Sequence, residues 1–197
     1  LLSATQLPVA LWRFGLYMVL GTGLYLWFVW RTPTHSSWQA SKEPLTAIVY
    51  ATGVWGSTWV ASGAIKWESI VLGGVFLGIT LQSMMLFSHF EAISYPKVLN
   101  TARWMGRKNT HLTTRTLTYL VVLACLLVIL LSEGRYALRL SIVLFGMVLS
   151  NETILYHSTQ LLYKERYRIW GEAVFLLPIF VLLHLPLLNA PTPPAFF

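Results

Sequence analysis

Polar side chains within long apolar stretches are the residues of this chain that can carry chemistry, because an apolar environment makes each of them costly. One such stretch covers residues 69–90 and contains Gln82 and His89. These residues are seven apart, so on a helix they lie within about 20° of each other, and Glu91 follows just beyond. This face suits a lipid headgroup, a metal ion or the iron or magnesium of a tetrapyrrole. The alternative is a structural histidine at the membrane interface that donates to a neighbouring carbonyl.

A second polar group lies in the apolar stretch over 137–163. It contains Asn151, Glu152, Tyr156, His157 and Gln160. Glu152 and Tyr156 share one helix face, whereas His157 is rotated by about 140° from Glu152. A glutamate at that depth is either neutral or paired with a cation from another span. Hydrogen bonding between helices explains this group as well as a ligand does, and His157 can also meet His89 across helices.

One further histidine is a candidate for chemistry, and the sequence lacks the motifs of several familiar enzyme classes. His184 lies between Pro178 and Pro186, where it suits a structural partner for the carbonyls that a proline frees. The sequence contains no glycine-rich phosphate loop, paired cysteines, zinc signature or nucleophile elbow. All seven acidic residues are glutamates, so chemistry that requires aspartate is excluded from this segment. The single cysteine, Cys125, is interpreted as a small buried hydrophobic residue.

The elements that must position these residues are membrane-spanning helices. Of 197 residues, 56% are apolar and only 11% are charged, against about 25% in ordinary soluble domains. The mean hydropathy is +0.63. These values exclude a soluble enzyme, a disordered chain and a disulfide-stapled secreted module. We expect one all-α domain over 1–197, a polytopic bundle of about six helices, each near the ~20 residues that cross a bilayer. The expected spans are 8–30, 45–65, 69–90, 117–132, 137–163 and 170–189.

Basic residues are unequally divided between the two sides of this bundle. The connections 31–44, 91–116 and 164–169 fall on one side and contain ten lysines and arginines, against four on the other. The ten-residue side, including the 91–116 connection, is expected to be cytoplasmic. Both ends of the sequence then lie outside, which favours an odd number of spans upstream of Leu1. The net charge of +7 follows from this asymmetry, and nucleic acid is not an expected partner.

Small residues recur at a spacing of four on two of the expected spans. Gly53, Ser57 and Ala61 do so on the second span, and Gly74 and Gly78 on the third. Because small residues let helix backbones approach closely in lipid, these positions predict helix packing seams.

The order of features from the second span to the fourth resembles the carboxy-terminal half of the UbiA superfamily of intramembrane prenyltransferases. A span rich in small residues is followed by a short turn, an apolar span and a basic loop. The residues that carry the resemblance are Gly53, Gly56, Ser57, Ala61, Ser62 and Gly63, then Trp67, Glu68 and Ser69, then Phe87, Ser88, His89, Phe90 and Glu91, and finally Trp104, Met105, Gly106, Arg107 and Lys108. In that family the equivalent loop is cytoplasmic and carries the second aspartate-rich motif.

The resemblance covers about 45–185 and departs from the family at its metal ligands. Counting back from Gly106, the acidic positions fall near Leu86, His89 and Ile93, and none is acidic. Because magnesium needs hard oxygen ligands against a diphosphate, we expect no magnesium site in this segment. The resemblance implies three further spans with the first aspartate-rich motif upstream of Leu1.

Three functions stay open at this point. The first is a non-catalytic UbiA-like protein, a structural or lipid-binding subunit of a membrane complex, with lipids and other membrane subunits as partners. Its basic loop would attract an anionic headgroup through Lys97, Arg103, Arg107 and Lys108. The second is a divergent prenyltransferase whose upstream half supplies the metal ligands. The third is a pigment- or haem-binding subunit of a photosynthetic or respiratory complex, with His89, His157 or His184 as axial ligands.

Overall fold

The structure, a computed structural model, describes residues 8–33, 36–63, 65–95, 97 and 99–179. Within these ranges the chain is helical and contains no strand. The elements in order are α1 (Val9–Arg31), η2 (Ser37–Ser41), α2 (Lys42–Ser62), α3 (Trp67–Ser94), α4 (Thr101–Met105), α5 (Arg107–Leu131), α6 (Arg135–Tyr156), α7 (Ser158–Leu161), η3 (Tyr163–Glu165) and α8 (Arg166–Val174). The expected all-α class is confirmed.

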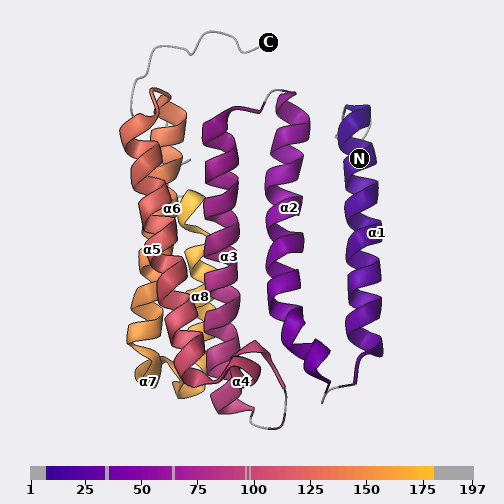
Figure 1. The fold of residues 1–197 in the computed structure, drawn as a ribbon, viewed down its shortest axis with the longest axis vertical. Helices are drawn as coiled ribbons and strands as arrows, with labels where there is room; N and C mark the ends of the chain where they lie inside the picture. Colours follow the sequence, from indigo (N-terminus) through magenta and orange to yellow (C-terminus); the bar gives the residue numbers. More distant parts are fainter. Residues whose placement is uncertain (1–7, 34–35, 64, 96, 98, 180–197) are drawn as a thin grey trace.

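The long helices run up and down beside one another, with α3 at the centre (Figure 1). Helix α3 contacts α2 on one side and α5, α6 and α8 on the other, and α1 lies at the edge, where it packs on α2. The buried apolar core therefore lies mainly between α3, α5 and α6, around residues such as Ile79, Val128 and Met147. None of the residues of α1 is buried.

Four of the described helices are long and apolar enough to cross a membrane: α1, α3, α5 and α6. Helix α2 has 21 residues but is not among them, so the expected number of about six is not confirmed. The sixth expected span, 170–189, is described only through α8 and the residues up to 179. Its remaining residues, including His184, lie outside the described ranges.

The largest differences from the expected spans are at two helix ends. Helix α5 begins at Arg107, well before the expected 117, because a buried stripe of threonines continues its packing face toward the amino terminus. The hydroxyls of Thr110, Thr114 and Thr118 each bond a carbonyl four residues earlier, which satisfies them inside a helix. Helix α6 ends at Tyr156 rather than at 163. Beyond it the chain turns through α7 and η3, where Lys164 and Glu165 have positive φ angles.

Glycines allow close helix packing, although at positions that differ in part from the predicted seams. A Cβ on Gly78 would lie 2.6 Å from Val121 of α5, and one on Gly53 would lie 3.4 Å from Met18 of α1. A Cβ on Gly74 would meet nothing within 4 Å, whereas on Gly73 it would lie 2.1 Å from Trp55. The close approach between α2 and α3 therefore requires Gly73, and Gly74 is not part of it.

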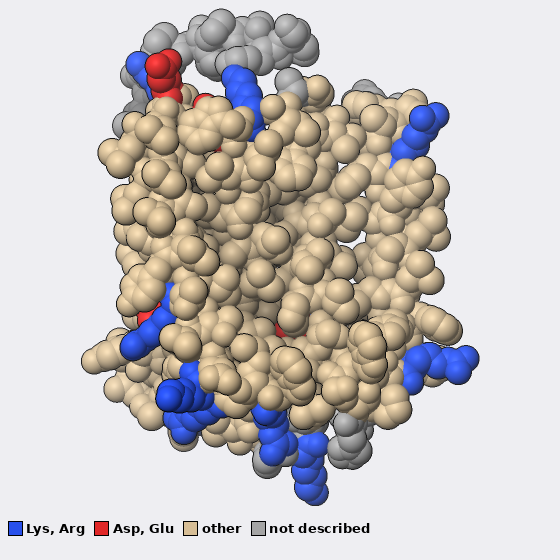
Figure 2. Space-filling model, viewed as in Figure 1, with Lys and Arg blue, Asp and Glu red and all other residues tan. Residues whose placement is uncertain are grey.

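The three basic connections lie at one end of the bundle, which we call the basic end. The links from α1 to α2, from α3 through α4 to α5, and from α6 to α8 all lie there (Figure 1). Figure 2 shows lysine and arginine side chains gathered at this end and fewer at the opposite one. The charge asymmetry of the sequence is thus a spatial asymmetry of the fold.

Candidate functional site

A polar cluster joins three helices in the interior of the bundle. The Gln82 amide of α3 donates to Thr118 Oγ1 of α5 at 2.8 Å, and its oxygen accepts from Asn151 Nδ2 of α6 at 3.2 Å. Thr118 Oγ1 also lies 2.9 Å from Glu152 Oε2, and Arg115 Nε lies 3.8 Å from Glu152 Oε1. Of the two alternatives for Glu152, the structure shows pairing with a cation from another helix.

This cluster holds the helices together and leaves little room for a ligand. Gln82 and Asn151 are almost fully buried, and the amide of each is committed to an interhelical hydrogen bond. Thr118 bonds Thr114 of its own helix as well. Because these partners come from α3, α5 and α6, the cluster fixes the mutual position of the three helices that form the core.

Glu91 lies in a separate ion-pair cluster at the basic end. Its carboxylate lies 3.7 Å from Arg168 of α8, and Arg168 also lies 3.4 Å from Glu165. Tyr95 donates to Glu165 at 2.5 Å. Two residues along a helix turn the side chain by about 200°, so Glu91 does not share the face of His89. The cluster attaches α8 to the end of α3.

The residues at the end of α6 do not join either cluster. Tyr156, His157 and Gln160 are exposed, and His157 Nδ1 contacts the Thr153 carbonyl of its own helix at 3.0 Å. The ring beside His89 is that of His111 on α5, with the centroids 4.6 Å apart. Of the possible partners for His89, the structure therefore shows His111 and not His157.

Three of the predicted ligand-binding residues line one small cavity. His89 of α3, Arg103 of α4 and Arg107 of α5 surround a space of about 220 Å³, together with Ala92, Ile93, Ala102 and Gly106. His89 is 3% exposed, and its Nε2 is buried without a hydrogen-bond partner among the residues described. Lys97, in the turn between α3 and α4, is exposed and is not among the lining residues. We call this space the basic cavity.

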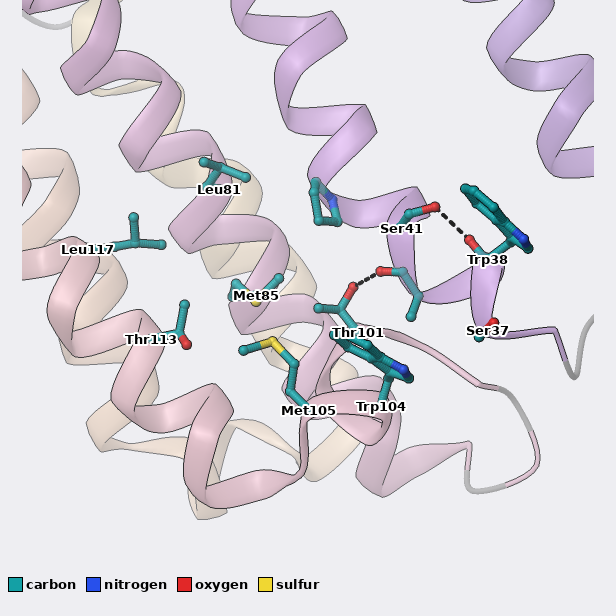
Figure 3. Close-up of a pocket in the computed structure, with 12 residues that line it drawn as sticks. Ser37, Trp38, Ser41, Leu81, Met85, Thr101, Trp104, Met105, Thr113 and Leu117 are labelled. Atoms are coloured by element: carbon teal, nitrogen blue, oxygen red, sulfur yellow. Dashed lines mark hydrogen bonds between the residues drawn. The ribbon is translucent and has the colours of Figure 1, made fainter.

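A larger, apolar cavity lies on the other side of α4. It measures about 570 Å³ and is bounded by η2, the start of α2, α3, α4 and α5 (Figure 3). Its walls are predominantly apolar, and its lining includes Leu81, Met85, Met105 and Leu117. Trp38 and Trp104 also line it and are mostly exposed. We call this space the apolar cavity.

Short helix α4 forms the wall between the two cavities, and polar contacts fix its position. Asn100 caps its start by accepting from Arg103 N at 3.0 Å, and the Asn100 amide donates to the Ser88 carbonyl of α3. The buried Thr101 hydroxyl contacts the Ala40 carbonyl, as Figure 3 shows, and Glu43 Oε2 at 2.7 Å. The wall is therefore attached to η2, α2 and α3, and this preorganises both cavities.

The described ranges contain no group of three histidine, cysteine, aspartate or glutamate residues that could hold a metal ion. The sequence analysis did not single out His111 or the apolar lining. His111 lies seven residues before Thr118 on the same buried side of α5, and helix periodicity through the basic connection would have placed it. No sequence pattern could have predicted the apolar cavity, because its lining comes from five separate elements.

The chain was compared with protein-family models, curated proteins and solved structures, and none matches it.

Proposed function

We propose that this chain is a multi-pass membrane protein that binds an apolar lipid chain in the apolar cavity and serves as a structural or lipid-binding subunit of a membrane complex. The observation that carries the proposal is the cavity of about 570 Å³ between η2, α2, α3, α4 and α5. Its size falls in the range of about 300–1,000 Å³ that is typical of ligand sites. Its apolar walls suit a hydrocarbon chain, and the exposed Trp38 and Trp104 suit the level of lipid headgroups.

The proposed topology has six spans with the basic end in the cytoplasm. Four of these spans are the candidate helices α1, α3, α5 and α6. The fifth is α2, which has 21 residues and runs between α1 and α3, and the sixth is the segment that begins with α8. Ten of the fourteen lysines and arginines belong to the three connections at the basic end. The excess of cationic residues on one side is the general determinant of orientation and supports this assignment.

The proposal includes a UbiA-like scaffold without transferase chemistry. Two of the positions expected to be acidic, Leu86 and His89, are almost fully buried in α3, and the third, Ile93, is an exposed apolar residue. The nearby Glu91 is paired with Arg168. The expected result is no turnover by the purified protein with magnesium, a prenyl diphosphate and quinone or tetrapyrrole acceptors; robust turnover would favour the divergent prenyltransferase instead.

The test of lipid binding fills the cavity with a side chain. Thr113 lines the apolar cavity on α5, whereas Thr116 is exposed on the same helix and is not among the lining residues. Thr113→Trp is expected to lower the amount of co-purified lipid, measured by native mass spectrometry after mild detergent extraction. Thr116→Trp is the matched control, because it makes the same substitution on the same helix outside the cavity.

The outcome separates cavity binding from general lipid association. A loss of at least half of the bound lipid in Thr113→Trp, with Thr116→Trp like the parent, supports the proposal. Equal occupancy in all three proteins refutes it, because a filled cavity cannot hold the chain. Circular dichroism and thermal melting of each variant show whether the bundle is intact, and a visible absorbance spectrum tests the pigment alternative in the same preparation.

A further inference from the structure

We propose that the basic cavity binds a phosphate group, with Arg103 and Arg107 as the charged donors and His89 as the buried donor. In the membrane this phosphate belongs to a lipid headgroup, and in this respect the inference rests on the proposed function. The same chemistry would bind inorganic phosphate, so the experiment below includes both sources.

Both arginines flank the cavity without an acidic partner. The ion pairs of the described residues join Lys42 with Glu43, Arg115 with Glu152, and Arg168 with Glu91 and Glu165. Arg103 and Arg107 appear in none of these pairs. Both side chains are exposed, and both residues line the cavity. Guanidinium groups bind phosphate oxygens through two parallel hydrogen bonds, so two free arginines at one cavity form a site for that group.

The backbone between these arginines brings them to the same cavity. Gly106 has a φ of +81° and joins α4 to α5, a conformation that residues with a Cβ rarely adopt. This turn places Arg103 of α4 and Arg107 of α5 around one space with Gly106 itself in the lining. The arrangement is therefore part of the fold and does not depend on the two long side chains alone.

His89 supplies the observation that points to a ligand. Its side chain is 97% removed from solvent, yet Nε2 has no hydrogen-bond partner among the described residues. Buried polar atoms are rarely left unpaired, because the lost hydration is not replaced. A phosphate oxygen in the cavity would accept from Nε2 when that nitrogen carries the proton. The two arginines of the lining add donors and positive charge, which favour an anion over a cation.

The glutamates on the helices around the cavity have other partners, and none of the ion pairs among the described residues includes a cavity arginine. Glu91 pairs with Arg168, Glu152 with Arg115 and Thr118, and Glu43 with Thr101. The basic cavity also lies across α4 from the apolar cavity. Thr101, Trp104 and Met105 line the apolar side, and Ala102, Arg103 and Gly106 line the basic side. A site for a headgroup phosphate thus adjoins a site for a hydrocarbon chain at the basic end.

The experiment compares charge removal inside and outside the cavity. Arg103→Gln and Arg107→Gln each remove a lining charge, and Lys108→Gln is the matched control. The sequence analysis grouped Lys108 with the two arginines as a cation for a headgroup. In the structure Lys108 is exposed and adjacent to Arg107 but is not among the lining residues, so it lies outside the proposed site. Each protein, in its full length, is placed in phosphatidylcholine nanodiscs with or without phosphatidic acid, and bound lipid is measured by native mass spectrometry. A second arm titrates inorganic phosphate by ³¹P nuclear magnetic resonance.

We expect saturable binding of phosphatidic acid that falls about tenfold in Arg103→Gln and in Arg107→Gln, and less than twofold in Lys108→Gln. His89→Gln, which keeps a donor, is expected to lose less than His89→Leu. Binding of inorganic phosphate with the same variant pattern, but without preference for phosphatidic acid, supports the phosphate site and assigns a soluble source. An equal loss in Lys108→Gln, or no saturable binding in either arm, overturns the proposal. If the Thr113→Trp test fails, the apolar cavity is not a site for a lipid chain. The comparison of the arginine variants with Lys108→Gln still tests the phosphate site on its own.

Discussion

The substitution Gln82→Leu tests the view that the interhelical polar cluster is structural. Gln82 is fully buried in α3 and bridges the other two core helices through Thr118 and Asn151. Leucine fits an apolar surrounding but makes neither hydrogen bond. The Asn151 amide then loses its partner at a site where its own oxygen already has none.

The structure allows the size of the effect to be worked out. Two interhelical hydrogen bonds are lost, each worth about 0.6 kcal/mol in membrane proteins, which gives about 1 kcal/mol. The stranded amide of Asn151 adds about 1–2 kcal/mol, because it stays buried without a partner. We therefore expect the free energy of unfolding to fall by about 2–3 kcal/mol. Losing the Gln82 partner costs less at Thr118 than at Asn151, because the Thr118 hydroxyl still donates to the Thr114 carbonyl.

The assay is unfolding of the purified protein in mixed micelles by increasing sodium dodecyl sulfate, followed by circular dichroism. The double variant Gln82→Leu/Asn151→Leu removes the stranded amide together with its partner. Its loss should be smaller than the sum of the two single losses by about 1 kcal/mol. Gln160→Leu, on the exposed surface beyond α6, serves as the control. Strictly additive losses, or a loss below about 0.5 kcal/mol in Gln82→Leu, would refute the reasoning.

Two further predictions concern helix packing and pH. Gly78→Ala is expected to lower the free energy of unfolding by about 1–3 kcal/mol, because its Cβ meets Val121 at 2.6 Å. Gly74→Ala, with open space at that position, should raise it by about 0.5–1 kcal/mol, and the same unfolding assay would contradict this if the two variants behaved alike. The hydrogen bond from Tyr95 to Glu165, and the negative charge of that carboxylate, raise the pKa of Tyr95. The hydrogen bond from Tyr95 should therefore contribute its full stability at pH values below the ordinary tyrosine pKa of about 10. It should be lost as the pH rises through the raised pKa of Tyr95. Subtracting the ultraviolet titration curve of Tyr95→Phe from that of the parent protein should show the raised pKa of Tyr95. Glu165→Gln should reverse this shift, and identical titration curves for the parent and Glu165→Gln would argue against the contact.

The helical class and the position of the basic residues could be predicted because both follow from local properties. The pattern of apolar runs separated by charges places the long helices, although their ends depend on interactions that hydropathy does not measure. Helix α5 shows this clearly. Its first turns are more polar than the expected span. One face of these turns is buried against α3 and α4, and the hydroxyls of Thr110 and Thr114 are satisfied on the helix itself.

The candidate site shows the same division between local and distant interactions. The spacing of Gln82 and His89 predicts one helix face, and both side chains contact α5 in the structure, Gln82 through Thr118 and His89 through His111. The spacing does not say what each would meet. Gln82 is committed to a structural cluster, whereas His89 has an unpaired nitrogen beside a cavity.

The sequence by itself determined that the chain is helical, that several of its helices are long and apolar and that its cations are unequally distributed, because composition and periodicity are summed along the chain. The tertiary structure decided which residues share a site. Arg103 and Arg107 line one cavity with His89 because Gly106 turns the chain and α4 packs on α3. The apolar cavity likewise exists only where η2, α2, α3, α4 and α5 meet. Such meetings depend on contacts between distant segments, and no local pattern of residues contains them.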